Sequence, residues 1–262
     1  QEKYRIAIEH LMEQLRNHPR TKCNNFWHKQ IYPNQMWLDG LYMAQPFLTE
    51  YADLMDKPEL YDDIVNQFVW MEKNAKDPKT GLLYHGWDES RKERWSNPKT
   101  GVSPHFWGRG MGWFAFALVD VLDYFPTSHP GHPKIVAILQ RTIEAVAKYQ
   151  DPKTGVWYDI VDLPHREGNY HEGSASSMFT YAMAKGLRKG YLDKKYLKNV
   201  EKAHAGLLKV FVEEVSPTHI NLNKIVAVSG LGGSKNYRDG SFEYYMSEPV
   251  ISNDPKGVGP FM

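Results

Sequence analysis

The stretch DPKTGLLYHGWD, residues 77–88, returns later in the chain as DPKTGVWYDIVD, residues 151–162, and in shorter form as NPKTGVSPHFW, residues 97–107. Proline stops a preceding helix, and glycine supplies the positive φ that a tight turn needs. The two full copies also share an aromatic continuation, which makes chance recurrence of the turn a poor explanation. The repeat therefore predicts a fold assembled from similar units.

Helices are the expected units, because apolar residues recur at three- and four-residue spacing while strand signals are sparse. The segment YRIAIEHLMEQLRNH, residues 4–18, places one apolar stripe on a helix, formed by Ile6, Ile8, Leu11, Met12 and Leu15. The same periodicity predicts further helices over about 35–55, 60–76, 107–124, 134–150, 173–189 and 194–214. The sequence thus predicts an all-α fold.

Each full copy of the repeat follows an amphipathic helix and leads, after a loop, into a helix that opens with small or aromatic residues. This alternation predicts outer helices, long aromatic loops and inner helices, and such hairpins bury their apolar faces only by stacking or by closing a ring. The loops that enter the inner helices would then line one rim. The last fifty residues are rich in Gly, Asn and Ser, which is typical of a functional or disordered segment, although Phe242, Tyr244 and Tyr245 favour order.

Composition limits the classes of function. A chain of 262 residues with 42% hydrophobic residues can bury a substantial core, and a net charge of +1 gives no general attraction to nucleic acid or a membrane surface. The single cysteine, Cys23, excludes an intramolecular disulfide, and no run of 18 apolar residues predicts a membrane span. The 8 Trp and 16 Tyr suit sugar binding, although aromatic residues also fill the space between helices.

The segment FWHKQIYPNQMWLDGLYM, residues 26–43, contains the strongest catalytic candidate. Asp39 lies between Leu38 and Gly40 with Trp37 close by, and a carboxyl group desolvated by aromatic rings should have a raised pKa. Such an acid can hold a proton near neutral pH and deliver it to a substrate. The alternative is an ordinary helix cap. Asn34 lies further upstream and is the more natural cap, so we favour catalysis.

Three other segments carry polar groups that could bind a ligand. HFWGRGMGW, residues 105–113, offers glycines and Arg109 for an anion at a helix N-terminus, or merely close helix packing. His85 could bind a sugar hydroxyl or orient Asp39, and His171 with Glu172 precedes a run of small residues that suits either a ligand or packing. No H-E-x-x-H motif occurs among the 11 histidines, so we expect no metal and no other cofactor.

Taken together, the segments 26–43, WGRGMGW (107–113) and YYMSEPVISNDPKGVGPF (244–261) resemble the unsaturated rhamnogalacturonyl hydrolases of glycoside hydrolase family 105, and more distantly the unsaturated glucuronyl hydrolases. The resemblance runs over essentially the whole chain. It implies one (α/α)6 toroid domain over residues 1–262, built of six hairpins, with the N-terminal hairpins and the last helix of the family absent. It also implies a bacterial enzyme of pectin degradation that acts in the cytoplasm, with periplasm and secretion left open.

The resemblance further implies the chemistry. Asp39 would protonate the C4=C5 enol ether of an unsaturated galacturonyl residue, water would add at C5, and the hemiketal would open to release rhamnose and a keto-uronate. The remaining positions that match the family would contact the substrate, with Arg109 as the partner of its carboxylate: Lys29, Trp37, His85, Trp107, Arg109 and Trp113. The expected partner is a small oligosaccharide, and the rate should follow a bell-shaped pH profile with an optimum on the acidic side of neutral.

Three alternatives stay open at this point. The substrate could carry an unsaturated glucuronyl residue. A sugar epimerase or isomerase on a similar toroid would bring two histidines together, and the residues that would have to converge are His85 and His171, with Asp39 turned away. An oligosaccharide-binding protein without catalysis would use the same aromatic rim.

Overall fold

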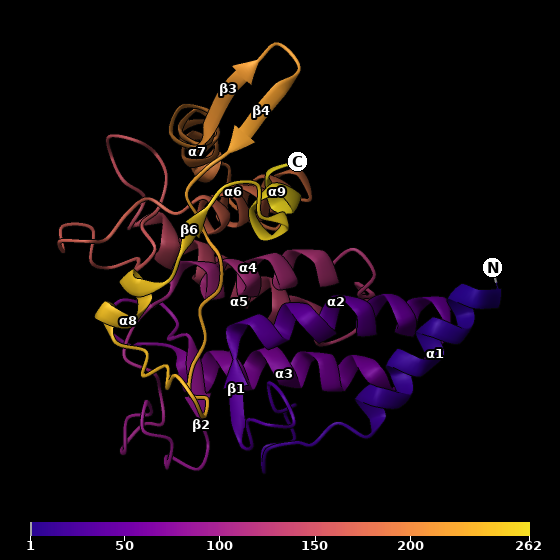
Figure 1. Cartoon of the computed structure of the whole chain (residues 1–262). Coiled ribbons are helices and arrows are strands. Elements are labelled where there is room, and N and C mark those ends of the chain that lie inside the picture. The colour runs from indigo at the N-terminus through magenta and orange to yellow at the C-terminus, as the bar shows by residue number, and fades with distance from the viewer. Residues whose placement is uncertain (1) are drawn as a thin grey trace.

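Inner and outer helices alternate along the chain. A computed structural model describes residues 2–262 of the protein. Four inner helices pack in sequence, each on the next (Figure 1): α2 (Leu38–Leu54), α4 (Gly108–Val121), α6 (Gly173–Arg188) and α9 (Pro255–Phe261). The outer helices α3 (Leu60–Ala75), α5 (His132–Ala147) and α7 (Leu197–Phe211) pack against α2, α4 and α6 respectively. The predicted all-α fold with outer and inner helices is confirmed.

The burial of each helix follows from its place in this order. Nearly every residue of α4 is buried, because α2, α6 and α5 cover it from different sides. The outer helix α5 buries one stripe only, which includes Ile135, Ile138 and Ile143. A fully buried side chain of this size stabilises the fold by about 1.5–3 kcal/mol, so most of the stability comes from these apolar faces and not from helix propensity.

The three copies of the repeated turn have the same backbone structure. Gly81, Gly101 and Gly155 have φ values of +79°, +83° and +81°, as the turn chemistry predicts. In each copy the glycine N–H donates to the carbonyl of the first residue of the turn, at 2.7–2.9 Å. A Cβ added to Gly101 would lie 2.4 Å from the carbonyl oxygen of Asp88, so this turn also requires glycine for lack of space.

Short antiparallel ribbons join the loops. The strand β1 (Gln35–Trp37) pairs with β2 (Gly86–Asp88), and β5 (Ile225–Val226) pairs with β6 (Val250–Ile251). The strands β3 (Val212–Ser216) and β4 (His219–Leu222) form a hairpin that projects beyond α7 (Figure 1). The 3-10 turn η1 (Lys194–Tyr196) precedes α7, and the short helix α8 (Phe242–Ser247) lies in the ordered C-terminal segment.

Some predicted boundaries are wrong. The helix expected from residue 35 begins at Leu38, because residues 35–37 pair with β2, and Asn34 has a φ of +65° and does not cap the helix. The helix expected to reach 214 ends at Phe211, where β3 follows.

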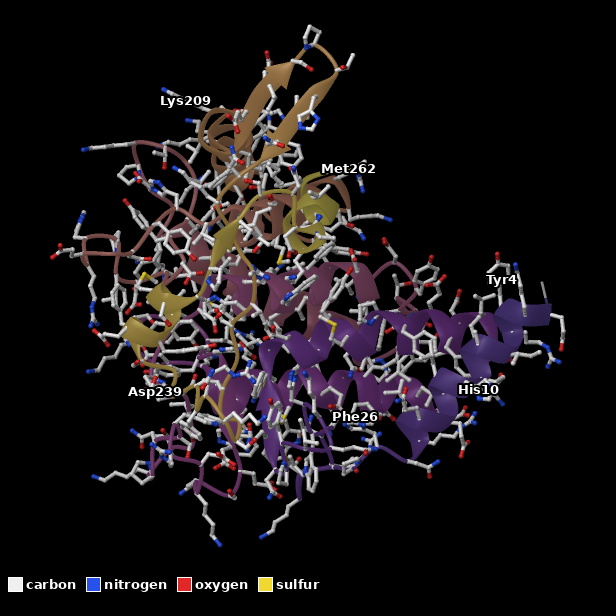
Figure 2. All side chains as sticks on the ribbon, in the orientation of Figure 1. Tyr4, His10, Phe26, Lys209, Asp239 and Met262 are labelled. Atoms are coloured by element: carbon white, nitrogen blue, oxygen red, sulfur yellow. The ribbon has the colours of Figure 1, made fainter. Side chains whose placement is uncertain are left out.

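The apolar stripe of α1 (Glu2–Arg16) is only partly buried. Met12 is buried, whereas Ile6 and Leu11 are exposed to 50% and 47%. Figure 2 shows Tyr4 and His10 on this helix, at the end of the molecule away from Asp239, which precedes α8. Within residues 2–262 no helix combines the length and the apolar character needed to cross a membrane.

Candidate active site

Backbone carbonyls of the repeat hold the first residue of two inner helices. The N–H of Leu38, which opens α2, donates to the carbonyl of His85 at 3.0 Å. The N–H of Gly108, which opens α4, donates to the carbonyl of Asp159 at 2.7 Å. These bonds satisfy donors that a helix end leaves free, and they bring the side chains of the loops to the helix entrances. A candidate site therefore forms where α2 and α4 begin.

Asp39 and His85 form the centre of this site. Nε2 of His85 lies 3.3 Å from Oδ2 of Asp39, in the first turn of α2, and the two side chains are 0% and 15% exposed. The atoms are not aligned as a hydrogen bond, so both are buried polar atoms without a hydrogen-bond partner among residues 2–262. A buried pair that is close but unsatisfied has hydrogen-bonding capacity that a third group could complete.

The expected raised pKa of Asp39 is wrong. Burial by itself would raise the pKa of this carboxyl, but the nearby ring N–H of His85 outweighs burial and lowers the pKa below its ordinary value. Aromatic residues beside Asp39 were evident in the sequence. The sequence did not reveal that a residue more than forty positions away supplies the polar partner.

Aromatic rings enclose the pair. The His85 ring lies 4.5 Å from the ring centre of Trp107 and 5.3 Å from that of Trp37, and its Nδ1 is 2.8 Å from the hydroxyl of Tyr245 on α8. Gly110 completes the enclosure, because a Cβ there would lie 3.2 Å from the Trp107 ring and 3.7 Å from Oδ2 of Asp39. The absence of a side chain at Gly110 therefore lets α4 lie close to Asp39 and Trp107, and the approach of a ligand to this glycine stays a prediction.

Gly108 and Gly112 serve helix packing instead. A Cβ on Gly112 would lie 2.8 Å from Sδ of Met178, and one on Gly108 would lie 3.1 Å from Cβ of Ala175, both on α6. The packing alternative therefore describes these two glycines.

Trp37 also forms a stack with the rings of His28 and Tyr32. His28 lies 4.1 Å from Trp37, and Tyr32 lies 5.1 Å from it, with interplanar angles of 12° and 18°. Burial lowers the pKa of His28 to about 3, so this ring is neutral. Lys29 is exposed, with its ammonium 5.8 Å from the centre of the Tyr32 ring. A hollow of about 220 Å³ borders the stack at His28 and Trp37.

Arg109 is buried beneath Trp107 and faces protein groups. Its Nε donates to Oγ of Ser174 at 2.9 Å, and its Nη2 lies 3.7 Å from Oε1 of Glu172, with the side chains of Arg109 and Glu172 only 1% and 0% exposed. Nη2 has no hydrogen-bond partner among residues 2–262. The two N–H groups of Nη2 are thus left without an acceptor, in a region closed to bulk water.

Asp159 belongs to the same buried group and was not predicted. Its Oδ1 accepts from Nε1 of Trp107 at 3.1 Å, and its Oδ2 has no partner among residues 2–262. Burial, and then the negative charge of Glu172, raise the pKa of Asp159 well above its ordinary value. The sequence did contain a sign that Asp159 lies near the site, because Asp159 and His85 are each the ninth residue of their copy of the repeat.

Two further residues that the sequence singled out, Trp113 and His171, contact other partners. Trp113 packs against Tyr42 at 4.5 Å and belongs to an aromatic cluster between α2 and α4. His171 pairs with Asp151, the first residue of the second full copy of the repeat, at 2.7 Å. Because His85 faces Asp39 while His171 is engaged with Asp151, the contacts lack the histidine pair that an epimerase would need. Within residues 2–262 no group of three or more His, Cys, Asp or Glu side chains could hold a metal ion.

Comparisons with known proteins agree with this arrangement. The model of Glycosyl Hydrolase Family 88 matches residues 1–262. The chain is 40% identical over 227 residues to protein Atu3128 of Agrobacterium fabrum, covering 84% of this chain and 95% of the relative. It is 29% identical over 202 residues to the unsaturated rhamnogalacturonyl hydrolase YesR of Bacillus subtilis, covering 77% of this chain and 54% of YesR.

A solved structure is also similar over the whole fold. The family 105 glycoside hydrolase of C. acetobutylicum ATCC 824 superimposes with a TM-score of 0.97 at 51% identity, over 99% of this chain and 72% of that chain. The predicted (α/α) toroid and the predicted resemblance to family 105 are both confirmed.

Proposed function

The chain belongs to glycosyl hydrolase family 88, and from that membership we propose that it hydrolyses the unsaturated rhamnogalacturonan disaccharide with Asp39 as the proton donor. The unsaturated substrate is supported by the 29% identity to YesR and by the similarity to a family 105 structure. The observation that carries the proposal is the Asp39–His85 contact of 3.3 Å, at a helix entrance walled by Trp37 and Trp107.

The chemistry proposed for Asp39 needs one well-placed acid. The carboxyl transfers its proton to C4 of the enol ether, which leaves an oxocarbenium centre at C5, stabilised by the ring oxygen. Water adds at C5 while the Asp39 carboxylate accepts a proton from it, so the acid is regenerated. The hemiketal then opens, and rhamnose leaves. Two carboxylates flanking the anomeric carbon, as in ordinary glycosidases, are not required, because C1 is not the first centre attacked.

The lowered pKa of Asp39 is compatible with this role. In the substrate-free protein the carboxylate form is favoured by His85. A bound uronate adds a second carboxylate nearby and expels water, and both changes favour the protonated form of Asp39. When the proton moves to C4, the same ring N–H of His85 stabilises the carboxylate that forms. His85 therefore helps most in the transition state, where stabilisation increases the rate.

The other residues would hold the sugar. Trp37 and Trp107 both contact the His85 ring and would form apolar walls beside the sugar. Arg109 would attract the uronate carboxylate through its charge and its unsatisfied Nη2, reinforced by the N-terminus of α4. Lys29 is exposed and would meet the outer part of the substrate, and Trp113 would contribute through the aromatic cluster that it forms with Tyr42.

The test uses the unsaturated disaccharide, its saturated counterpart and an unsaturated disaccharide with a glucuronyl residue. We expect loss of the ultraviolet absorbance of the enol with the first substrate and no release of rhamnose from the saturated one. In D2O, one deuterium should appear at C4 of the product. Cleavage of the saturated disaccharide, or product without deuterium at C4, would overturn the mechanism. Faster turnover of the glucuronyl substrate would show instead that the protein is an unsaturated glucuronyl hydrolase.

A further inference from the structure

Tyr245 reaches the candidate site from a segment far along the chain. It lies on α8, which is capped by the hydroxyl of Ser241 accepting from the Tyr244 N–H at 3.1 Å. The Tyr245 side chain is 0% exposed and stacks on Trp107 with ring centres 6.1 Å apart and an interplanar angle of 26°. Its hydroxyl lies 2.8 Å from Nδ1 of His85. A fully buried phenol with one polar contact has a fixed role in hydrogen bonding.

The direction of that hydrogen bond follows from both ends of the His85 ring. If Nδ1 carried the proton, Nε2 would turn a lone pair toward Oδ2 of Asp39 at 3.3 Å, and the tyrosine proton would have no acceptor. If Tyr245 donates to Nδ1, the ring proton lies on Nε2 and points toward the carboxylate. Only the second arrangement gives the tyrosine proton an acceptor and turns the ring N–H, not a lone pair, toward the carboxylate.

We propose that Tyr245 is a positioning residue, whose O–H···Nδ1 bond fixes the tautomer and orientation of His85 and so keeps an N–H directed at Asp39. The inference rests on the proposed function for its effect on the rate, but the tautomer itself is a property of the substrate-free protein. Tyr245 acts through His85 and touches no reacting atom.

The surroundings of Tyr245 keep its hydroxyl protonated. Burial raises the pKa of the Tyr245 phenol well above its ordinary value, and the neighbouring Tyr244 and the negative charges of Asp39 and Asp239 act in the same direction. His105 approaches the Tyr245 ring edge-on at 6.5 Å, and burial lowers the pKa of His105. The phenol therefore remains a donor over the working pH range.

Tyr244 provides a matched control. It is the neighbouring tyrosine on the same helix, and its hydroxyl accepts from the Gly230 N–H at 3.0 Å and donates to Glu248 at 2.6 Å. Tyr244→Phe removes the same atom as Tyr245→Phe and disturbs the same helix, without touching His85. A difference between the two variants therefore reports on the His85 contact.

The first experiment is 15N NMR of protein labelled at its histidines, without substrate. The signals of His85 are assigned by their absence from the spectrum of His85→Gln. We expect the wild-type Nε2 to carry the proton and Nδ1 to be an acceptor. In Tyr245→Phe the tautomers should mix, and in Tyr244→Phe they should not. A wild-type ring protonated on Nδ1 overturns the proposal, and so does a Tyr245→Phe spectrum identical to that of Tyr244→Phe. None of these outcomes depends on the substrate.

The second experiment measures turnover of the unsaturated disaccharide. Tyr245→Phe should lower kcat roughly tenfold to a hundredfold, because a buried acceptor is left unsatisfied, with KM within about threefold of wild type. In the His85→Gln background the same substitution should change kcat by less than about twofold, since its effect passes through His85. Equal effects of Tyr245→Phe in both backgrounds would refute the positioning role. An inactive wild type would instead refute the proposed function.

Discussion

The two full copies of the repeat have the same backbone role and different side-chain chemistry at their ninth residue. The carbonyls of His85 and Asp159 each accept from the first N–H of an inner helix, α2 and α4 respectively. Both side chains are fully buried, and both contact Trp107, one through its ring and one through its Nε1. The repeat therefore fixes where a side chain is delivered, and the residue type decides what it does there.

The partners of these two positions produce opposite electrostatics. His85 faces a carboxylate, and the pKa of Asp39 is lowered although burial alone would raise it. Asp159 is desolvated and lies near the like charge of Glu172, so its pKa is raised. Asp39 retains 15% exposure and Asp159 none. A buried aspartate beside a tryptophan is thus a candidate acid only where a substrate can reach it, which favours Asp39.

Substitution of the two aspartates should change kcat by very different factors, and this is the strongest effect that we predict. Asp39→Asn should lower kcat roughly 10²- to 10⁴-fold, because it removes the transferable proton. The kcat of Asp159→Asn should stay within about tenfold of the wild-type value, since a protonated aspartic acid and an asparagine are both neutral and similar in shape. Initial rates on the unsaturated disaccharide measure both, with circular dichroism to check folding. A larger loss in Asp159→Asn than in Asp39→Asn would reverse the assignment.

The second prediction concerns the stability that the buried Glu172–Arg109 pair gives to the fold. Glu172 accepts from the Ala175 N–H, the Val226 N–H and the Ser174 hydroxyl, and it compensates Arg109. Glu172→Gln leaves the guanidinium uncompensated and should reduce the free energy of unfolding by about 3 kcal/mol. Urea denaturation measures this loss. The control is Glu243→Gln on the exposed surface, which should change it by less than about 0.5 kcal/mol. Equal losses in the two variants would show that the buried pair contributes no more to the free energy of unfolding than an exposed charge does.

A smaller effect is the pH dependence of stability, which should have opposite signs for the two aspartates. The raised pKa of Asp159 means that the folded state holds a proton that the unfolded state releases above about pH 4, so this group costs stability as the pH rises. The lowered pKa of Asp39 contributes stability above that pH, and this is lost as the pH falls through the folded pKa.

Unfolding curves of both Asn variants between acidic and neutral pH test these signs. Relative to wild type, Asp159→Asn should gain stability as the pH rises, and Asp39→Asn should lose it. Parallel curves for wild type and both variants would contradict the pKa directions.

The smallest effect is a separation of two pH profiles of the wild-type enzyme. The basic limb of kcat/KM reports the free protein, in which His85 lowers the pKa of Asp39, whereas the basic limb of kcat reports the complex with an anionic substrate. We expect the kcat limb at the higher pH. Coinciding limbs would mean that the bound carboxylate does not act on Asp39.

Much of the architecture followed from local sequence. The turns with Gly81 and Gly155 and the alternation of outer and inner helices depend on side-chain periodicity and on backbone preferences, which act over a few residues. The start of α2 was predicted wrongly because residues 35–37 read locally as helix but pair with β2, some fifty residues away. Local propensity yields to such tertiary pairing.

The candidate site was only partly predictable. Asp39 and His85 were recognisable as polar residues among aromatic ones, and Arg109 as a charge at a helix start. Asp159 and Tyr245 were not singled out for chemistry, since their importance comes from contacts with Trp107 and His85 across the fold.

The repeat, the helices and the groups that reach the rim are all written in the local sequence, because turn chemistry and apolar periodicity act over a few residues. Which acid is held as a carboxylate and which as a neutral acid depends on the packed fold. The free energy of an ionised group depends on its burial and on the charges within a few ångströms, and His85 and Glu172 arrive at those distances only when the helices pack.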